Sequence, residues 1–243
     1  MGRITQALIL AGGEGARLKP LTDHVPKAMV KIHGKPLLEH QVNVLKKYGV
    51  EEVVMLVYYM HEKIIDYFGD GTKVGVEVDY VIEKEPLGTA GPLKLAEKKL
   101  HENFFLGNAD ELTSLDLNDL ASYHFKHGKI GTIFLHKVED VSRFGVVELN
   151  GDRIVRFVEK PRPDEAPSHY INSGKYVLNR RILEFIGEGK QSMERDVFPK
   201  LAERGELIGF IPTKPTVWYT MNTLQQFLAL EEEFNMGNMP WLE

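Results

Sequence analysis

Glycines and cations lie close together in ALILAGGEGARLKPLTDHVPKAMV, the stretch from residue 7 to residue 30. The residues in question are Gly12, Gly13, Gly15, Arg17 and Lys27. Glycine lets the backbone approach a ligand and point successive N–H groups at an anion. The loop follows an apolar run typical of a buried strand, and α/β proteins bind ligands beyond such strand ends. The stretch favours a phosphate site, with a tight turn carrying solvated cations as an equal alternative.

Two familiar phosphate-binding motifs do not fit this loop. The dinucleotide pattern G-x-G-x-x-G requires glycine at position 18, where the chain has Leu18. The P-loop requires Gly-Lys-Ser/Thr after four intervening residues, and this too is absent. The loop therefore belongs to another class of anion site.

The bulk composition is that of an ordinary globular protein. Of 243 residues, 43% are hydrophobic and 27% charged, with a net charge of −5 that offers nucleic acid no electrostatic footprint. The absence of cysteine excludes disulfides and thiolate catalysis and is compatible with a reducing cytosol. No apolar run approaches the roughly 20 residues that span a bilayer, and the N-terminus has no signal-peptide pattern. We expect a cytoplasmic protein with neither membrane nor nucleic-acid partners.

The first half of the chain alternates between strand-like and helix-like segments. Strands are expected at 7–11, 51–59, 76–86 and 103–110, and helices at 36–49, 61–71, 88–100 and 117–128. Thr89 is a candidate N-cap for the third helix. This alternation predicts an α/β fold of Rossmann-like type, with a mixed, mostly parallel sheet and helices on both faces.

The second half is richer in antiparallel signals. Strands are expected at 129–138, 144–161, 169–179 and 207–213, and helices at 180–189, 192–205 and 224–234. The turn Asn150-Gly151-Asp152 predicts a hairpin within the second of these strands. We expect a single domain over 1–243, with a nucleotide-binding half at about 1–115 and a sugar-phosphate-binding half at about 116–243.

Several ordered motifs resemble those of the sugar-1-phosphate nucleotidylyltransferases. LAGGEGARLKPLT followed by PKAMVKIHGKP resembles the family signature, with Ala16 where the family usually has threonine. EKEPLGTAGPLKLA, FFLGNADELTSLDL, FGVVELNGDRIVRFVEKP and INSGKYVLN resemble later segments. SMERDVFPKLAERGEL is most similar to the mannose-1-phosphate guanylyltransferase branch. We expect no left-handed β-helix domain of the kind some members append, because the chain stops near Glu243.

The resemblance implies roles for individual residues. The catalytic residues would be Arg17, Lys27 and Asp110, with Mg²⁺ held by Asp110. The nucleotide-binding residues would be Leu10, Ala11, Gly12, Gly13, Gly15, Glu85, Gly88 and Thr89. The sugar-phosphate-binding residues would be Asn108, Phe144, Gly145, Glu159, Lys160, Asn172 and Gly174. Guanine would need hydrogen-bond acceptors, for which Glu85 is preferred to Glu83.

The implied reaction joins a sugar 1-phosphate to a nucleoside triphosphate and releases pyrophosphate. Nucleophile and electrophile are both anions, and the sugar phosphate is already ionised at pH 7. The protein therefore needs cations and accurate positioning more than it needs a general base. GTP with mannose 1-phosphate is favoured, dTTP or UTP with glucose 1-phosphate is the alternative, and a homo-oligomer is left open.

The expected second metal ligand is missing. Family members usually carry Trp-x-Asp-x-Gly-Thr late in the chain, whereas this sequence has Thr220 at the aspartate position and Asn222 at the glycine position. Glu111 adjoins Asp110, but strand alternation should point it elsewhere. Catalysis is then slowed, or another carboxylate substitutes, or the chain is a non-catalytic nucleotide-sugar-binding paralogue. A glycosyltransferase is a third option, disfavoured because no Asp-x-Asp motif occurs at Asp110.

Other polar clusters have plain structural interpretations. His124 and His127 lie three residues apart on an expected helix, where a solvated face is favoured over zinc. The lysine pairs Lys46-Lys47 and Lys98-Lys99 are also expected on solvated faces.

Overall fold

The computed structural model describes residues 2–242 of the chain, which divides into two compact units, each treated by itself. The glycine-loop unit comprises Thr5–Pro86, Gly107–Asp116 and the residues from Thr216 onward. The hairpin unit comprises the residues up to Ile4, Leu87–Leu106 and Leu117–Pro215. The units therefore interleave along the sequence.

The glycine-loop unit is built on parallel strands, as the alternating pattern predicts. They are β1 (Gln6–Leu10), β4 (Glu52–Val57) and β5 (Glu77–Ile82), in the order β5-β4-β1. Leu8 pairs with Val54, and Val54 pairs with Asp79. The side chains of β1 and β4 are almost wholly buried, which explains why these strands have continuous apolar sequences.

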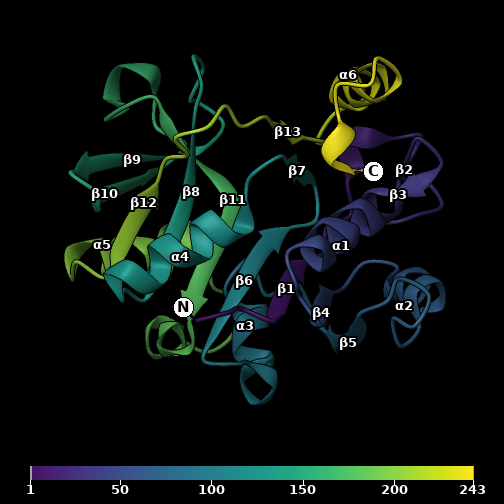
Figure 1. The fold of residues 1–243 in the computed structure, drawn as a ribbon, viewed down its shortest axis with the longest axis horizontal. Coiled ribbons are helices and arrows are strands. Elements are labelled where there is room, and N and C mark those ends of the chain that lie inside the picture. Colours follow the sequence, from purple (N-terminus) through teal and green to yellow (C-terminus); the bar gives the residue numbers. More distant parts are fainter. Residues whose placement is uncertain (1, 243) are drawn as a thin grey trace. The chain divides into compact units, whose positions relative to one another are not determined.

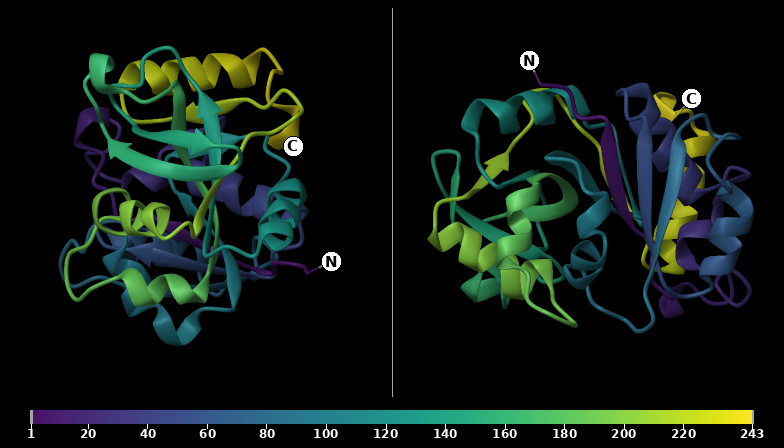
Figure 2. Two further views of the ribbon diagram at one scale, coloured as in Figure 1. Left: turned by 90° about the vertical axis from the view of Figure 1, so that its left-hand side faces the viewer. Right: turned by 90° about the horizontal axis from the view of Figure 1, so that it is seen from below.

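Helices and small hairpins complete this unit. The helices α1 (Leu37–Lys47) and α2 (His61–Phe68) lie on one side of the parallel strands (Figure 2). The hairpin β2–β3 joins Lys31–Ile32 to Lys35–Pro36, and a second small sheet pairs β7 (Glu111–Thr113) with β13 (Trp218–Thr220). The last long helix is α6 (Leu224–Asn235), and short 3₁₀ turns occupy Ala16–Leu18 (η1), Lys27–Met29 (η2) and Pro240–Leu242 (η7).

The hairpin unit carries a mixed sheet. Its strands are β6 (Asn103–Asn108), β8 (Gly131–Lys137), β9 (Gly145–Asn150), β10 (Arg153–Glu159), β11 (Tyr170–Asn179) and β12 (Leu207–Phe210), in the order β6-β11-β8-β12-β10-β9. The strands β8 and β12 run parallel, while β8–β11, β10–β12 and β9–β10 are antiparallel. The expected turn at Gly151 closes β9 onto β10 with a positive φ of 60°. The final two residues of β6 belong to the glycine-loop unit.

Helices cover both faces of this sheet. Ile133 pairs with Tyr176, whose ring packs on Phe198 at the start of α5 (Phe198–Glu203). Thr132, one residue before Ile133, points to the other face and bonds His124 of α4 (Leu117–His127). The helices α4 and α5 therefore lie on opposite sides of the strands (Figures 1 and 2), and the mixed α/β fold is confirmed.

Three expected helices are shorter than their sequence patterns. The segment 88–100 forms α3 (Gly91–Leu95) and the 3₁₀ turn η3 (Glu97–Lys99). The segment 180–189 forms the 3₁₀ helix η5 (Arg180–Phe185), and 192–205 divides into a π-helical turn η6 (Met193–Val197) and α5. Pro92 and Pro199 lie in the first turns of α3 and α5. The missing N–H of proline is harmless there, and its fixed φ favours the start of a helix.

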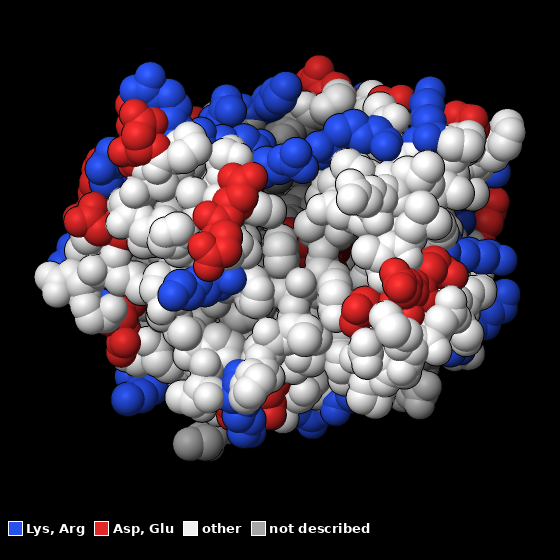
Figure 3. All heavy atoms as spheres, turned by 90° about the horizontal axis from the view of Figure 1, so that it is seen from above, with Lys and Arg blue, Asp and Glu red and all other residues white. Residues whose placement is uncertain are grey.

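Surface charge and chain hydropathy agree with the composition. The face drawn in Figure 3 carries both signs of charge, with many Lys and Arg side chains along its upper part in that view and Asp and Glu in separate groups. Across residues 2–242, no helix combines the length and apolar character needed to cross a membrane.

The segment 161–169 contains the short 3₁₀ helix η4 (Pro163–Glu165), beside which Arg162 forms an ion pair of 2.7 Å with Glu165.

Candidate active site

The glycine loop opens where β1 ends. The amide of Ala11 still donates to Leu56 in the neighbouring strand over 2.8 Å, and the chain then leaves the sheet. Gly13 is exposed, and a Cβ built there meets no heavy atom within 4 Å. The backbone N–H groups here can approach a ligand without steric hindrance.

Gly15 is needed for two reasons. Its φ of 74° lies in the left-handed region, and a Cβ there would stand 2.8 Å from the Cβ of Lys27. Its carbonyl accepts a hydrogen bond of 2.9 Å from the Thr22 hydroxyl. The glycine thus lets Lys27 pack directly against the loop.

Asp110 is brought beside the loop by its neighbours in the chain. The amide of Ala109 donates to the carbonyl of Leu10 over 3.0 Å, so the chain before Asp110 runs alongside the end of β1. The carbonyl of Asp110 accepts from the amide of Met221 over 2.8 Å. The late segment around Thr220 is thereby held next to Asp110.

The two cations converge on the side-chain amide of Asn222, and Lys27 also contacts the carboxylate of Asp110. Lys27 forms an ion pair with Asp110, the two side chains being 13% and 22% exposed. The Lys27 amine also donates to Oδ1 of Asn222 over 2.7 Å, and the Arg17 guanidinium donates to the same oxygen over 3.2 Å. The three expected catalytic residues, Arg17, Lys27 and Asp110, therefore share one site.

Asn222 has a role in orienting the two cations that the sequence did not predict. Its Nδ2 donates to the hydroxyl of Thr220 over 2.6 Å, and its backbone amide donates to Oε1 of Gln226 over 2.8 Å. Gln226 lies in the first turn of α6, whose N-cap is Thr223. The only signal in the sequence is that an asparagine replaces a glycine within a resembling motif.

Asp110 is the anionic ligand that this site presents to a metal. Thr220 is buried, and its hydroxyl oxygen already accepts from Asn222. Over the described part of the chain, no group of three or more His, Asp or Glu side chains is placed to hold a metal. These residues fit a metal that arrives already ligated by phosphate oxygens, for which Asp110 would supply one carboxylate.

Glu111 does not join Asp110, as strand alternation predicts. Its side chain is buried, and Oε1 accepts a 3.2 Å hydrogen bond from Nδ2 of Asn108. The backbone carbonyl of Asn108 in turn accepts from Gln41 over 3.1 Å. Asn108 therefore lies within this unit, two residues before Asp110.

The two candidate base acceptors differ sharply in exposure. Glu83 is 8% exposed, and its Oε1 would lie 3.1 Å from a Cβ on Gly12. Glu85 is exposed, two residues further along the chain. The geometry places Glu83, rather than Glu85, against the glycine loop.

The expected sugar-side residues of the hairpin unit also gather. Gly145 pairs with Glu159, and a Cβ there would collide with Phe157 at 2.4 Å. The carbonyl of Phe144 accepts from the Lys160 amide over 2.9 Å, and the Lys160 amine lies 3.1 Å from Glu159. Lys160 has a φ of 50°, which is uncommon for a residue with a side chain.

The other wall of this group comes from β11. Ile171 of β11 pairs with Val146 of β9. Asn172 directly follows Ile171 and Gly145 directly precedes Val146, so Asn172 and Gly145 both adjoin this pair. Oδ1 of Asn172 accepts from the amide of Gly174 over 3.1 Å, and Gly174 has a φ of 70°. Asn172 and Gly174 therefore lie within β11 at a bulge, where the β8–β11 register shifts.

Thr89 is not an N-cap, contrary to the sequence prediction. The residue before α3 is Ala90, and no side chain caps that helix. The Thr89 hydroxyl instead donates to Glu194 over 2.6 Å and accepts from the Met193 amide over 2.9 Å. Gly88 packs against the backbone of Gln191, whose carbonyl oxygen would lie 2.4 Å from a Cβ added to Gly88. Partners about 100 residues away thus replaced the local cap.

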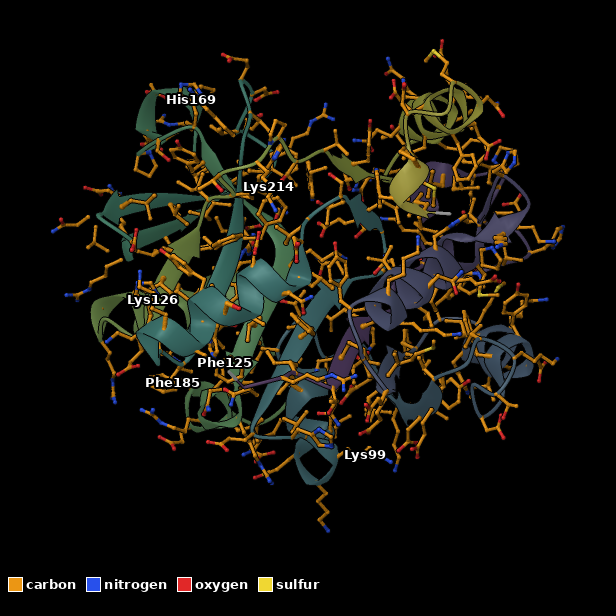
Figure 4. The ribbon with its side chains drawn as sticks, in the orientation of Figure 1. Lys99, Phe125, Lys126, His169, Phe185 and Lys214 are labelled. Carbon is orange, nitrogen blue, oxygen red and sulfur yellow. The ribbon has the colours of Figure 1, made fainter. Side chains whose placement is uncertain are left out.

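The solvated-face interpretation is wrong for His124. This side chain is 2% exposed, and it bonds Thr132 over 2.8 Å and Asn103 over 3.2 Å. Burial lowers the pKa of His124 to about 4. His127 is partly buried against Tyr123. The lysine pairs are exposed as expected, and Lys99 lies at the outer edge of its unit (Figure 4).

Comparison with known proteins gives a family match. A family model described as "Nucleotidyl transferase" matches residues 6–235. A mannose-1-phosphate guanylyltransferase catalytic subunit beta of Danio rerio is 43% identical over 208 residues, covering 83% of this chain and 57% of that protein. A mannose-1-phosphate guanyltransferase of Saccharomyces cerevisiae is 40% identical over 212 residues, covering 84% and 58%. The chain thus spans less than two thirds of these relatives.

Solved structures share the fold. HddC from Yersinia pseudotuberculosis complexed with GMP-PN is 31% identical, with a TM-score of 0.80 over 95% of this chain and 100% of that one. A UDP-glucose pyrophosphorylase complexed with UDP-glucose is 23% identical, with a TM-score of 0.84 over 96% and 99%. At that lower identity the second likeness concerns the fold alone.

Proposed function

Because this chain belongs to the nucleotidyl transferase family, we propose that it joins a sugar 1-phosphate to a nucleoside triphosphate. The observation that carries the proposal is the meeting of Arg17 and Lys27 at Asn222, with Lys27 also paired to Asp110, next to an open glycine loop. An anionic electrophile needs such a concentration of positive charge beside backbone N–H donors.

In the proposed reaction, an oxygen of the sugar 1-phosphate attacks the α-phosphorus of the nucleotide. The bond between the α-phosphorus and the bridging oxygen breaks, and pyrophosphate leaves with that electron pair. The N–H groups of residues 12–15 hold the triphosphate, and the planar fork of Arg17 binds the leaving oxygens. Lys27 lies near the α-phosphate, where its amine offsets developing negative charge.

The sugar phosphate is assigned to the hairpin unit. Lys160 would bind its phosphate, and Glu159 would accept hydrogen bonds from the sugar hydroxyls. The backbone of Phe144 and Gly145, with Asn172 and Gly174, would bound the sugar. The left-handed backbone of Lys160 supports this assignment, because such strain is concentrated at ligand-binding residues.

A Mg²⁺ ion bound to the nucleotide phosphates would neutralise part of their charge. Asp110 is the residue that would hold it, in exchange for part of its contact with Lys27. That exchange would free the Lys27 amine to turn toward phosphate. Thr220 could contribute only a neutral oxygen.

GTP and mannose 1-phosphate are the substrates that we propose. The names of the two relatives, at 43% and 40% identity, support this choice. The buried Glu83 beside Gly12 is the better-placed acceptor for the N1–H and N2–H₂ donors of guanine, with Glu85 as the more exposed alternative. The cysteine-free composition is compatible with a cytoplasmic reaction.

The non-catalytic alternative is not favoured. A sensor that binds the finished nucleotide sugar has less need to hold pyrophosphate. Arg17 and Lys27 are nevertheless both retained and both oriented by Asn222. This arrangement suits turnover better than product sensing.

The test is a panel of nucleoside triphosphates against sugar 1-phosphates, with pyrophosphate release as the readout. We expect GTP to be preferred strongly over ATP, because adenine lacks the N1–H and N2–H₂ donors that guanine offers to an acceptor such as Glu83. Arg17→Ala should cost roughly 2 to 4 kcal/mol of transition-state stabilisation. Lys19→Ala, an exposed cation two residues away, is the matched control. Wild-type turnover in the Arg17 variant, or equal use of ATP and GTP, would contradict the assignment.

A further inference from the structure

A second positively charged cavity lies in the glycine-loop unit, on the side of α1 where β2, β3 and the C-terminal segment gather (Figure 1). Its volume is about 660 Å³, which falls within the usual range for small-molecule sites. The lining residues that matter here are His33, Lys35, His40, Lys46, Lys47 and Phe234. The lining includes neither the glycine loop nor Lys27, Asp110 or Asn222.

Three lysines concentrate positive charge at this cavity in a chain whose net charge is −5. The amines of Lys46 and Lys47 donate to the backbone carbonyls of Val74 and Trp241, over 3.0 and 3.1 Å. Lys35 lies 3.9 Å from Glu39. Within residues 2–242, no aspartate or glutamate lines the cavity. The carbonyl contacts orient the amines of Lys46 and Lys47 without neutralising their charge, whereas Lys35 is paired with Glu39; the two unneutralised amines favour an anion.

A buried histidine in the wall has one nitrogen without a partner. His40 is 3% exposed, and its Nε2 donates to the carbonyl of Ile32 over 2.9 Å. Its Nδ1 has no hydrogen-bond partner in the described structure. Burial lowers the pKa of His40, so the ring is neutral and Nδ1 is a lone-pair acceptor. A buried acceptor of this kind costs free energy unless a ligand or water donates to it.

An aromatic shelf borders the same cavity. The rings of His33 and Phe234 stack with centroids 4.3 Å apart and an angle of 18° between their planes. His33 has a φ of 46° in the β2–β3 turn, and its amide donates to Glu231 of α6 over 2.7 Å. Because His33 is exposed, its ring can offer a second face to a planar group. The hydrogen bond to Glu231 thus connects the β2–β3 turn to α6.

We propose that this cavity is a second nucleotide site, separate from the glycine loop, that takes a phosphate-bearing ligand with a planar base. The phosphates would contact Lys35, Lys46 and Lys47, and the base would extend the His33–Phe234 stack. The site is a binding site only, and no reacting group lies in it.

The cavity lies at the far end of α6 from the catalytic residues. Asn222 directly precedes the N-cap of α6, and Phe234 is eleven residues past that cap. At a rise of 1.5 Å per residue, this separation is about 16 Å along the helix. Ligands at the two places can therefore be distinguished by substitution.

The experiment is calorimetric titration of GDP into the full chain carrying Arg17→Ala and Lys27→Ala, which disables the glycine loop. We expect one binding event per chain to remain. Adding Lys46→Glu and Lys47→Glu should weaken it at least tenfold, because charge-assisted contacts are lost and repulsion is introduced. Adding Lys98→Glu and Lys99→Glu instead, the same charge change on an exposed pair, should leave affinity within twofold. Lys35→Gln, a milder change at an exposed residue, should also weaken binding.

Three results would overturn the proposal. One is no GDP binding in the Arg17→Ala, Lys27→Ala background, with folding verified by circular dichroism. Another is equal weakening by the control lysine pair, which would indicate general electrostatics. The third comes from titrating parts of the ligand. Pyrophosphate that binds as tightly as GDP would show that the base makes no contact. Guanosine that binds as tightly as GDP would show that the lysines bind no phosphate. None of these measurements depends on turnover, so they do not test the proposed reaction.

Discussion

The amine of Lys27 donates to Oδ1 of Asn222 over 2.7 Å, joining residues that lie 195 positions apart in the chain. The same oxygen accepts from Arg17 over 3.2 Å. One neutral amide therefore positions both cations of the candidate active site. An aspartate at position 222 would add charge, and a glycine there would leave both cations without this anchor.

We predict that Asn222→Ala lowers kcat/KM for pyrophosphate release by ten- to a hundredfold. Hydrogen bonds to charged groups are worth about 1.5 to 3 kcal/mol, and both cations lose theirs. The thermal midpoint should change little, because Asn222 is only partly buried. Asn238→Ala, beyond the other end of α6, is the control. Unchanged kinetics in the Asn222 variant would show that Asp110 alone orients Lys27.

The sequence predicted this site where the information is local. A buried strand followed by glycines specifies both an exposed loop and a close backbone approach, and Gly13 and Gly15 behave accordingly. Asp110 was placed by its resemblance to the metal-binding aspartate of the family, and in the structure it follows the end of β6 by two residues. The loop inference rests on ligands binding beyond the strand ends of α/β sheets.

The misses arose from contacts between distant residues. Thr89 has the composition of a helix cap, but Met193 and Glu194 compete for its hydroxyl. His124 has the spacing of a surface residue, but Thr132 and Asn103 satisfy its ring in the interior. Asn222 could be seen only as a departure from a motif. Long-range hydrogen bonds of this kind leave no periodic trace in a single sequence.

We next predict that Lys160→Gly loses sugar-phosphate binding while retaining stability. Glycine removes the amine but adopts the φ of 50° without strain. Relief of that backbone strain should stabilise the fold by roughly 1 kcal/mol. Calorimetry should show weakened mannose 1-phosphate binding and unchanged GTP binding. Lys160→Ala should lose the same affinity but keep the strain. Loss of GTP affinity in either variant would contradict the assignment of the two ligands to different units.

Stability should fall as the pH is lowered from about 6.5 toward 4, in part because of His124. Its folded pKa of about 4 lies below its ordinary value of 6.5, so the unfolded chain takes up the proton first. Each pKa unit is worth about 1.4 kcal/mol, giving a loss on the order of 3 kcal/mol. Urea unfolding at several pH values should show a flatter dependence in His124→Asn. The exposed His101→Asn should keep the wild-type slope, and equal slopes in all three proteins would remove this explanation.

The last prediction concerns Thr220, where a hydroxyl stands in place of a carboxylate. With Asp110 as the single aligned anion, Mg²⁺ alone should bind feebly and enter mainly with the nucleotide. Thr220→Asp adds a second carboxylate to the segment that hydrogen-bonds to the backbone of Asp110, so calorimetry should show tighter Mg²⁺ binding without nucleotide. Thr213→Asp, the same change at an exposed position, should bind Mg²⁺ no better than the wild type.

Activity then decides what the hydroxyl means. If the half-formed metal site limits the rate, Thr220→Asp should raise kcat at low Mg²⁺, and adding Asn222→Gly should raise metal affinity further while sacrificing the anchor of Lys27 and Arg17. The single variant should therefore be the faster of the two. Tighter metal binding with lower kcat in the single variant would mean that Asp110 and Lys27 work best as an ion pair that the metal only partly displaces. In that case Thr220 and Asn222 would be a matched pair, and the missing aspartate would be no defect.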